Sequence, residues 1–262
     1  MKSLLCLLLA FAVSARADEV ANAGRAVLKK NQEAVVGVRV VVKVAVPGRE
    51  STQEVKVDAV GIVLDAKGLT VASLRIVEPS EVLSRAMGRQ IEAEVTDLKL
   101  ILADRTEVGA ALVLRDKDLD LAFLRPTEKL PKPVSVVSLN DAATPEVMEQ
   151  VIALARSNRT PRLDPILTDG RIAAIVDKPR LFYVATPALQ NSGPGSAVFA
   201  LNGKLIGQIL LQRTAKGETW SVIVPAADIA ETAKQAPAEA PKSKPAPKEE
   251  KKPAAPATPP AK

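Results

Sequence analysis

The feature that most constrains this fold is a series of short runs of valine, leucine and isoleucine separated by turn residues. In the first run, Val38-Arg39-Val40 and Val42-Lys43-Val44 alternate apolar and charged side chains, and Pro47-Gly48 ends the run. Alternation with a period of two is typical of a strand with one buried face. Similar runs recur as far as residue 224, with few helical patterns between them. Many short strands at this spacing predict an all-β sandwich or barrel.

An amphipathic pattern over Asp18–Lys30 predicts one short helix before the first strand, which spans Val35–Val46. The turn Asp65-Ala66-Lys67-Gly68 separates two of the later strands. We expect these later strands at Val55–Val57, Val60–Leu64, Leu69–Val71, Leu98–Leu102, Ala110–Leu114, Leu121–Leu124, Val151–Ala155, Arg171–Val176, Leu181–Ala185, Ala197–Phe199, Lys204–Leu211 and Thr219–Val224.

The first 17 residues are typical of a secretory signal peptide. Lys2 precedes an apolar run over Leu4–Val13, and Ala15-Arg16-Ala17 provides small residues for cleavage. The run is shorter than the roughly 20 residues of a membrane span, so we expect no transmembrane segment. Cys6 is the only cysteine of the chain. The mature protein would therefore have no disulfide and would depend on its core for stability.

The tail from Ala233 to Lys262 consists mainly of alanine, proline, lysine and glutamate, without apolar periodicity. Such a segment cannot bury enough surface to offset chain entropy, and we expect it to be disordered. Its seven lysines and three glutamates give a net charge of +4, so the excess positive charge of the mature chain lies in the tail. A near-neutral folded part with few aromatic residues argues against nucleic-acid binding.

Three segments, in chain order, resemble the segments that carry the catalytic triad of trypsin-like serine proteases. Residues 69–77, Leu-Thr-Val-Ala-Ser-Leu-Arg-Ile-Val, resemble the surroundings of the catalytic histidine. Residues 118–124, Asp-Leu-Asp-Leu-Ala-Phe-Leu, resemble those of the aspartate, and residues 192–199, Ser-Gly-Pro-Gly-Ser-Ala-Val-Phe, those of the nucleophilic serine. The likeness covers residues 35–228 and is greatest to the HtrA-type branch. It implies two packed antiparallel β-barrels.

Between the signal peptide (1–17) and the tail (233–262), this resemblance divides the chain into a helix with the first barrel (18–132) and a second barrel (133–232). The family's peptide-binding PDZ module, which usually follows the protease, has no counterpart before the tail.

The positions that match the triad are Arg75, Asp120 and Pro194. Counting back from Asn202-Gly203, or forward from Ala185-Thr186, places Pro194 at the serine position. The alternative, with Ser192 in the motif, needs an insertion after it. The chain contains no histidine at all.

Each of these replacements removes a chemical capability. A guanidinium stays protonated, so Arg75 cannot act as a general base. Pro194 has no hydroxyl and no backbone N–H, although the nucleophile's N–H is an oxyanion donor in this family. Asp120 has no histidine to orient, and we expect it to form an ion pair with Arg75.

Other chemistries have weaker support. Ser192 and Ser196 are candidate rescue nucleophiles, although nothing pairs either serine with a particular lysine in a serine–lysine dyad. The run Asp116-Lys117-Asp118-Leu119-Asp120 resembles the start of a calcium loop, but it lacks the glycine and the final acid that such a loop requires. Without histidine or a mature cysteine, zinc and iron–sulfur sites are excluded, and we expect no cofactor or metal.

The sequence therefore predicts an exported pseudoprotease, periplasmic or extracellular, that binds or scaffolds a polypeptide or envelope partner. One alternative is an active serine endopeptidase with a rearranged site. Another is a structural envelope protein tethered by its tail, whose lysines could contact an anionic envelope weakly.

Overall fold

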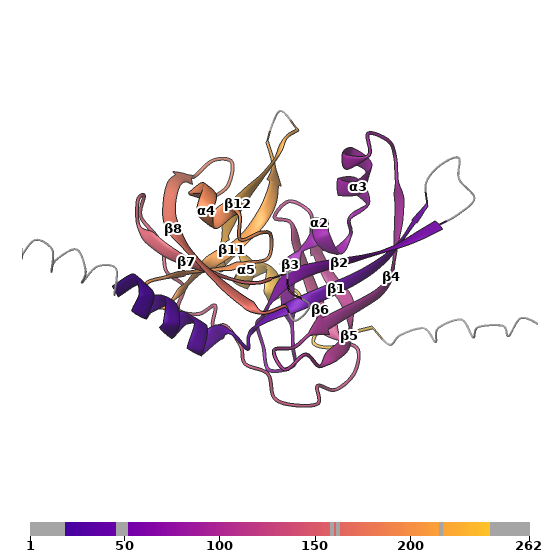
Figure 1. The fold of residues 1–262 in the computed structure, drawn as a ribbon, viewed down its shortest axis with the longest axis horizontal. Coiled ribbons are helices and arrows are strands. Elements are labelled where there is room, and N and C mark those ends of the chain that lie inside the picture. The colour runs from indigo at the N-terminus through magenta and orange to yellow at the C-terminus, as the bar shows by residue number, and fades with distance from the viewer. Residues whose placement is uncertain (1–18, 46–51, 158–159, 161–162, 215–216, 242–262) are drawn as a thin grey trace, which may run out of the picture.

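The computed structural model describes residues 19–45, 52–157, 160, 163–214 and 217–241. In this part of the chain the strands form two closed antiparallel barrels of six strands each (Figure 1). The strand order is β1-β2-β3-β6-β5-β4 in the first barrel and β10-β11-β12-β9-β8-β7 in the second. The all-β, two-barrel fold class expected from the sequence is confirmed.

The first barrel and its helices comprise β1 (Val35–Ala45), β2 (Thr52–Val63), β3 (Thr70–Ser73), α2 (Leu74–Val77), α3 (Ser80–Ala86), β4 (Glu92–Ile101), β5 (Glu107–Asp116) and β6 (Leu121–Pro126). The second comprises β7 (Gln150–Arg156), β8 (Pro165–Val176), β9 (Phe182–Ala185), α4 (Pro187–Gln190), β10 (Ala197–Ala200), β11 (Leu205–Arg213), β12 (Thr219–Pro225) and α5 (Ala226–Ala233).

Several strands are longer than predicted: β4 begins at Glu92 instead of Leu98, β8 begins at Pro165 instead of Arg171, and β2 joins two predicted strands. The sequence suggested separate strands at Val55–Val57 and Val60–Leu64, but β2 runs without a break through Asp58 and Ala59. Asp58 is accommodated because its carboxylate accepts a hydrogen bond from Arg39 Nε at 2.9 Å on the paired strand β1. The charged residue therefore forms a cross-strand pair instead of ending the strand.

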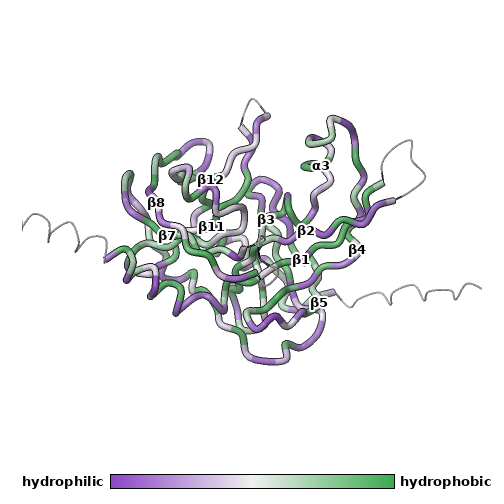
Figure 2. Tube along the Cα trace, viewed as in Figure 1, coloured by the Kyte–Doolittle hydropathy of each residue, from purple (hydrophilic) through white to green (hydrophobic). Residues whose placement is uncertain are grey.

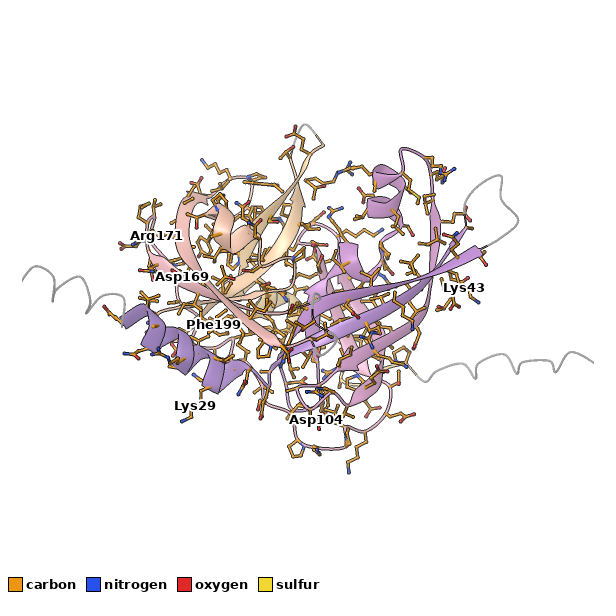
Figure 3. The ribbon with its side chains drawn as sticks, in the orientation of Figure 1. Lys29, Lys43, Asp104, Asp169, Arg171 and Phe199 are labelled. Carbon is orange, nitrogen blue, oxygen red and sulfur yellow. The ribbon has the colours of Figure 1, made fainter. Side chains whose placement is uncertain are left out.

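The alternation of side chains divides the apolar residues among three cores. Val38, Val40 and Val42 of β1 point into the first barrel, and Ile206, Ile209 and Ile223 fill the second. A third cluster lies between the barrels and includes Phe123 and Phe199. Figure 2 shows apolar segments along the strands in the middle of the molecule and polar segments on the outer loops. Phe199 lies in this interior, whereas Lys29 and Lys43 project from the surface (Figure 3).

Both ends of the described chain lie against the barrels. Residues 19–31 form the expected N-terminal helix, which lies along the second barrel (Figure 1). After α5, the chain returns to the first barrel, where the buried Arg125 donates from Nε to Pro237 O at 2.9 Å.

The predicted signal peptide (1–17) and residues 242–262 of the predicted tail lie outside the described residues. Residues 233–241, which the sequence analysis assigned to the disordered tail, are described instead: Ala233 ends α5, and Pro237 accepts the hydrogen bond from Arg125. No helix within the described residues combines the length and the apolar character needed to cross a membrane.

Candidate functional site

Asp120 lies at the seam between the two barrels, at the entrance to β6. The preceding turn is held by Asp116, whose Oδ1 accepts the N–H groups of Asp118 and Leu119. This turn delivers Asp120 with a φ of 62°, a left-handed conformation that aspartate tolerates better than most residues. Asp116 therefore stabilises the turn that leads into β6.

Asp120 as a whole is 1% exposed, and its carboxylate accepts three hydrogen bonds. The donors are Ser73 Oγ at 2.6 Å, Arg75 N–H at 2.7 Å and Leu211 N–H at 2.9 Å. Ser73 ends β3, Arg75 is the second residue of α2, and Leu211 belongs to β11 of the other barrel. Burial raises the pKa of the Asp120 carboxyl, while these hydrogen bonds and the charge of Arg75 act in the opposite direction. The carboxylate therefore joins the barrels through hydrogen bonds from both.

Arg75 lies beside Asp120, as the sequence predicted. Its Nε is 3.9 Å from Asp120 Oδ1, so the expected ion pair is confirmed. The guanidinium also donates from Nε to Leu211 O at 3.3 Å and from Nη1 to Glu81 Oε2 at 3.1 Å. Arg75 thus forms an ion pair with Asp120 and a hydrogen bond with the backbone of the opposite barrel. Its side chain is only 16% exposed.

Glu81 is a member of this site that the sequence analysis missed. Its Oε1 pairs with Arg213 Nη1 of β11 at 2.9 Å, while its other oxygen binds Arg75. We call these three residues, Arg75, Glu81 and Arg213, the Glu81 bridge. Beside them, Arg85 Nη1 donates to Thr219 Oγ1 of β12 at 2.8 Å. The bridge links α3 of the first barrel to the β11–β12 hairpin of the second, and both elements rise on the same side of the molecule (Figure 1).

Pro194, the third position that matches the triad, lies in the loop 191–196. The backbone N–H groups of this loop bond to carbonyl oxygens of the chain itself. Ser192 N–H bonds Leu189 O at 2.9 Å, and Gly193 N–H bonds Gln190 O at 3.2 Å. Two more N–H groups are used in the same way, Gly195 to Ile209 O at 2.7 Å and Ser196 to Gly193 O at 3.4 Å. Pro194 has none to offer. All the N–H groups of residues 192–196 are thus bonded within the chain.

Gly195 shows how closely this loop packs on the first barrel. Its φ is 93°, and a Cβ built there would lie 2.1 Å from Val60 O of β2. The position therefore requires glycine for both its conformation and its contact.

The two candidate rescue serines lie in different environments. Ser196 is fully buried, and its hydroxyl faces Ser192 O and Gly193 O, both at 2.8 Å. Ser192 Oγ is hidden from solvent and has no hydrogen-bond partner among the described residues. No lysine or other base of the described chain hydrogen bonds to either hydroxyl. A base bonded to the hydroxyl is the usual way in which a serine nucleophile is activated.

A cavity of about 890 Å³ opens next to the loop. Residues 57–60 of β2 and Ile76 of α2 line one wall, β7 and β8 line the other, and residues 191–194 border both. Its apolar lining includes Ile166 of β8, which is 42% exposed. Neither the cavity nor any other part of the described chain brings together three acidic, histidine or cysteine side chains that could hold a metal ion.

A family model described as a trypsin-like peptidase domain matches residues 59–207. The matched segment contains Arg75, Asp120 and the whole loop 191–196, and it covers more than half of the chain. No curated protein matches the chain.

Proposed function

Because this chain belongs to the family of trypsin-like peptidase domains, we propose that it is an exported member that has lost peptidase chemistry. It binds or scaffolds a polypeptide or an envelope protein in the cleft between its barrels. Within the family, its place is beside the HtrA-type branch, on the motifs of residues 69–77, 118–124 and 192–199.

The loop 191–196 carries this proposal. Peptide hydrolysis needs a nucleophile, a base to activate it and N–H groups aimed at the developing oxyanion. The loop has proline at the serine position, and its remaining N–H groups are bonded to Leu189, Gln190, Gly193 and Ile209. A donor already bonded within the protein would have to break that bond before it could stabilise an oxyanion.

Arg75 supports the same conclusion from the other barrel. Its guanidinium stays protonated and already bonds Leu211 O and Glu81, so it can neither accept a proton nor move freely. Asp120 keeps the family residue, but its carboxylate binds Ser73, Leu211 and the backbone of Arg75. These contacts give Asp120 a structural role that needs no histidine.

Export is supported by the sequence of the two ends. The first 17 residues have the pattern of a secretory signal, and the rest of the chain contains no cysteine, which fits a core-stabilised periplasmic or extracellular protein. The lysines of the tail could add weak contact with an anionic envelope.

One observation favours an alternative, a serine endopeptidase with a rearranged site. Ser192 borders the cavity, and its hydroxyl has no hydrogen-bond partner within the described chain. A substrate or a loop movement would have to provide the missing base.

An assay with fluorescently labelled casein, an unfolded polypeptide, separates the two. We expect the purified mature protein to bind casein without cleaving it between pH 5 and 9. Cleavage that disappears in Ser192→Ala or Ser196→Ala would overturn the proposal and establish the alternative. Absence of binding to casein would overturn the polypeptide-binding role.

A further inference from the structure

Three arginines meet at one exposed carboxylate beside the seam between the barrels. Arg75 Nη1 lies 3.1 Å from Glu81 Oε2, and Arg213 Nη1 lies 2.9 Å from Glu81 Oε1. Arg85 Nη2 lies 3.7 Å from the same Oε1, beyond hydrogen-bond distance, while its Nη1 donates to Thr219 Oγ1 at 2.8 Å. These guanidinium groups come from α2, β11 and α3. We call Arg75, Arg85 and Arg213 the arginine cluster.

The positive charge of the arginine cluster exceeds what the carboxylates beside it neutralise. Asp120, the other carboxylate near Arg75, is buried and already accepts three hydrogen bonds. Among the residues that the structure describes, Arg85 and Arg213 form an ion pair with no acidic group besides Glu81. Three guanidinium groups therefore share one carboxylate at the surface. Like charges held this closely repel each other, and a further carboxylate would relieve that repulsion.

The arginine cluster is open to a ligand from solvent. The side chains of Arg85 and Arg213 are 44% and 47% exposed, and only Arg75 is mostly covered. A guanidinium carries five N–H donors, and Glu81 offers two carboxylate oxygens to three such groups. Donors therefore remain for the carboxylates of a partner.

Glu81 holds its place in the arginine cluster only weakly. Its side chain is half exposed, and an ion pair between exposed side chains adds little to stability because water screens it. Glu81 belongs to α3, a helix of seven residues in which no residue is buried. A ligand with several carboxylates can engage the three arginines together, which the single carboxylate of Glu81 does less well. Such a ligand can displace Glu81 at little cost in packing.

We propose that the arginine cluster binds an acidic segment of the polypeptide partner. Carboxylates of that segment displace Glu81, which holds the guanidinium groups together in the free protein. This inference rests on the proposed polypeptide-binding function and names the charge of the partner. Arginine suits the role because its planar fork of donors matches a carboxylate and stays charged.

Two other occupants fit the arginine cluster less well. Arg75 lies at the seam and is 16% exposed, so a flat anionic surface would contact only Arg85 and Arg213. An acidic chain can place one carboxylate on Arg75 and others on the outer arginines, between α3 and the β11–β12 hairpin, which rise on the same side of the molecule (Figure 1). The protein's own tail has the wrong charge, because residues 242–262 contain six lysines and two glutamates.

Binding of a fluorescent acidic peptide to the full mature protein tests the inference. Glutamate alternates with alanine in this peptide, and a control peptide has glutamine in place of each glutamate. The unmodified protein should bind the acidic peptide more tightly than the control. We expect Arg213→Gln to weaken binding of the acidic peptide about tenfold, because hydrogen bonds to a charged group are lost. Arg115→Gln removes one exposed arginine charge from β5, where Arg115 pairs with Glu78, and should bind as the unmodified protein does.

Glu81→Gln gives a second measurement, because a poorly folded variant would not gain affinity. Removal of the internal carboxylate should tighten binding of the acidic peptide about threefold, the effect of one partly screened charge. Glu78→Gln removes the same charge from the pair with Arg115 and should leave binding unchanged.

Equal binding of the two peptides, with casein still bound, would overturn the acidic partner while leaving polypeptide binding intact. Equal losses in Arg213→Gln and Arg115→Gln would also overturn it, since net charge would then explain them. Weaker binding by Glu81→Gln would overturn the displacement of Glu81. Vesicles of phosphatidylglycerol that bind the unmodified protein but not Arg213→Gln would identify a membrane surface as the occupant and overturn a polypeptide. If the protein binds neither casein nor the acidic peptide, the proposed function fails together with this inference.

Discussion

Asp120 and the loop 191–196 both bind β11, at Leu211 and Ile209, yet they have opposite relations to the cleft. Asp120 gathers donors from both barrels onto one carboxylate. The loop donates its N–H groups to carbonyl oxygens of α4, of the loop itself and of β11. The difference shows that Asp120 joins the two barrels, whereas the loop N–H groups are used within the second barrel. Each N–H group of residues 192, 193, 195 and 196 is already bonded to a carbonyl oxygen.

The largest expected effect is at Asp120. Asp120→Ala removes the acceptor for the buried Ser73 hydroxyl and for two partly buried N–H groups, and it leaves Arg75 without its partner. We therefore expect a loss of about 3–5 kcal/mol in unfolding free energy. Urea denaturation measures this loss. Asp120→Asn keeps the shape and one acceptor oxygen and should cost less. A loss below about 1 kcal/mol for Asp120→Ala would mean that the seam does not depend on this carboxylate.

Gly195 tests the packing of the loop on β2. A Cβ at this position would lie 2.1 Å from Val60 O, and the φ of 93° is unfavourable for alanine. Gly195→Ala should therefore lower the unfolding free energy by about 2–4 kcal/mol. Gly193 is the matched control, because its φ is 86° but no atom lies within 4 Å of its added Cβ. Gly193→Ala should cost about 1 kcal/mol. Equal thermal and urea stabilities for the two variants would contradict the close contact.

The pH dependence of stability should reveal the buried carboxyl of Asp120, with a smaller effect because its hydrogen bonds oppose the effect of burial. Its pKa is raised above 3.8 in the folded protein, so the folded state binds this proton more tightly than the unfolded state. Stability relative to Asp120→Asn should therefore fall as pH rises from about 3.8 through the raised pKa, and level off above it. Urea titrations of both proteins over this range would measure the difference. A difference that grows with rising pH would show that the charged form is the favoured one.

The smallest effect is expected at the Glu81 bridge. Glu81 is 51% exposed, so Glu81→Gln should cost less than about 1 kcal/mol, and added salt should reduce the difference. Glu78→Gln is a matched control, because Glu78 forms an exposed ion pair with Arg115 and both residues belong to the first barrel. The two variants should have similar urea midpoints. A loss of several kcal/mol for Glu81→Gln alone would make the bridge a main connection between the barrels.

The sequence predicted most of the fold because alternating valines and turn residues act locally. The pairing of Arg75 with Asp120 was also predictable, since the resemblance to trypsin-like serine proteases implied that the two segments meet at the seam between the barrels. The role of Glu81 was not predictable, because the sequence of the short helix α3 has no pattern that indicates which face lies toward β11. The continuity of β2 through Asp58 depended on Arg39, a partner on another strand. The hydrogen bonds of the loop 191–196 were equally hidden, because they depend on where Ile209 and Gln190 lie in space.

Reaction with a fluorophosphonate, which labels activated serines, tests the central claim that the loop itself has lost its chemistry. We predict no labelling of the unmodified protein between pH 5 and 9. We also predict little labelling of the double variant Arg75→His with Pro194→Ser, because Gly193 and Gly195 would still have their N–H groups bonded to Gln190 and Ile209. Rapid labelling of the unmodified protein, abolished by Ser192→Ala, would contradict the claim. So would full labelling of the double variant at its new serine, since the loop would then have kept its donors available.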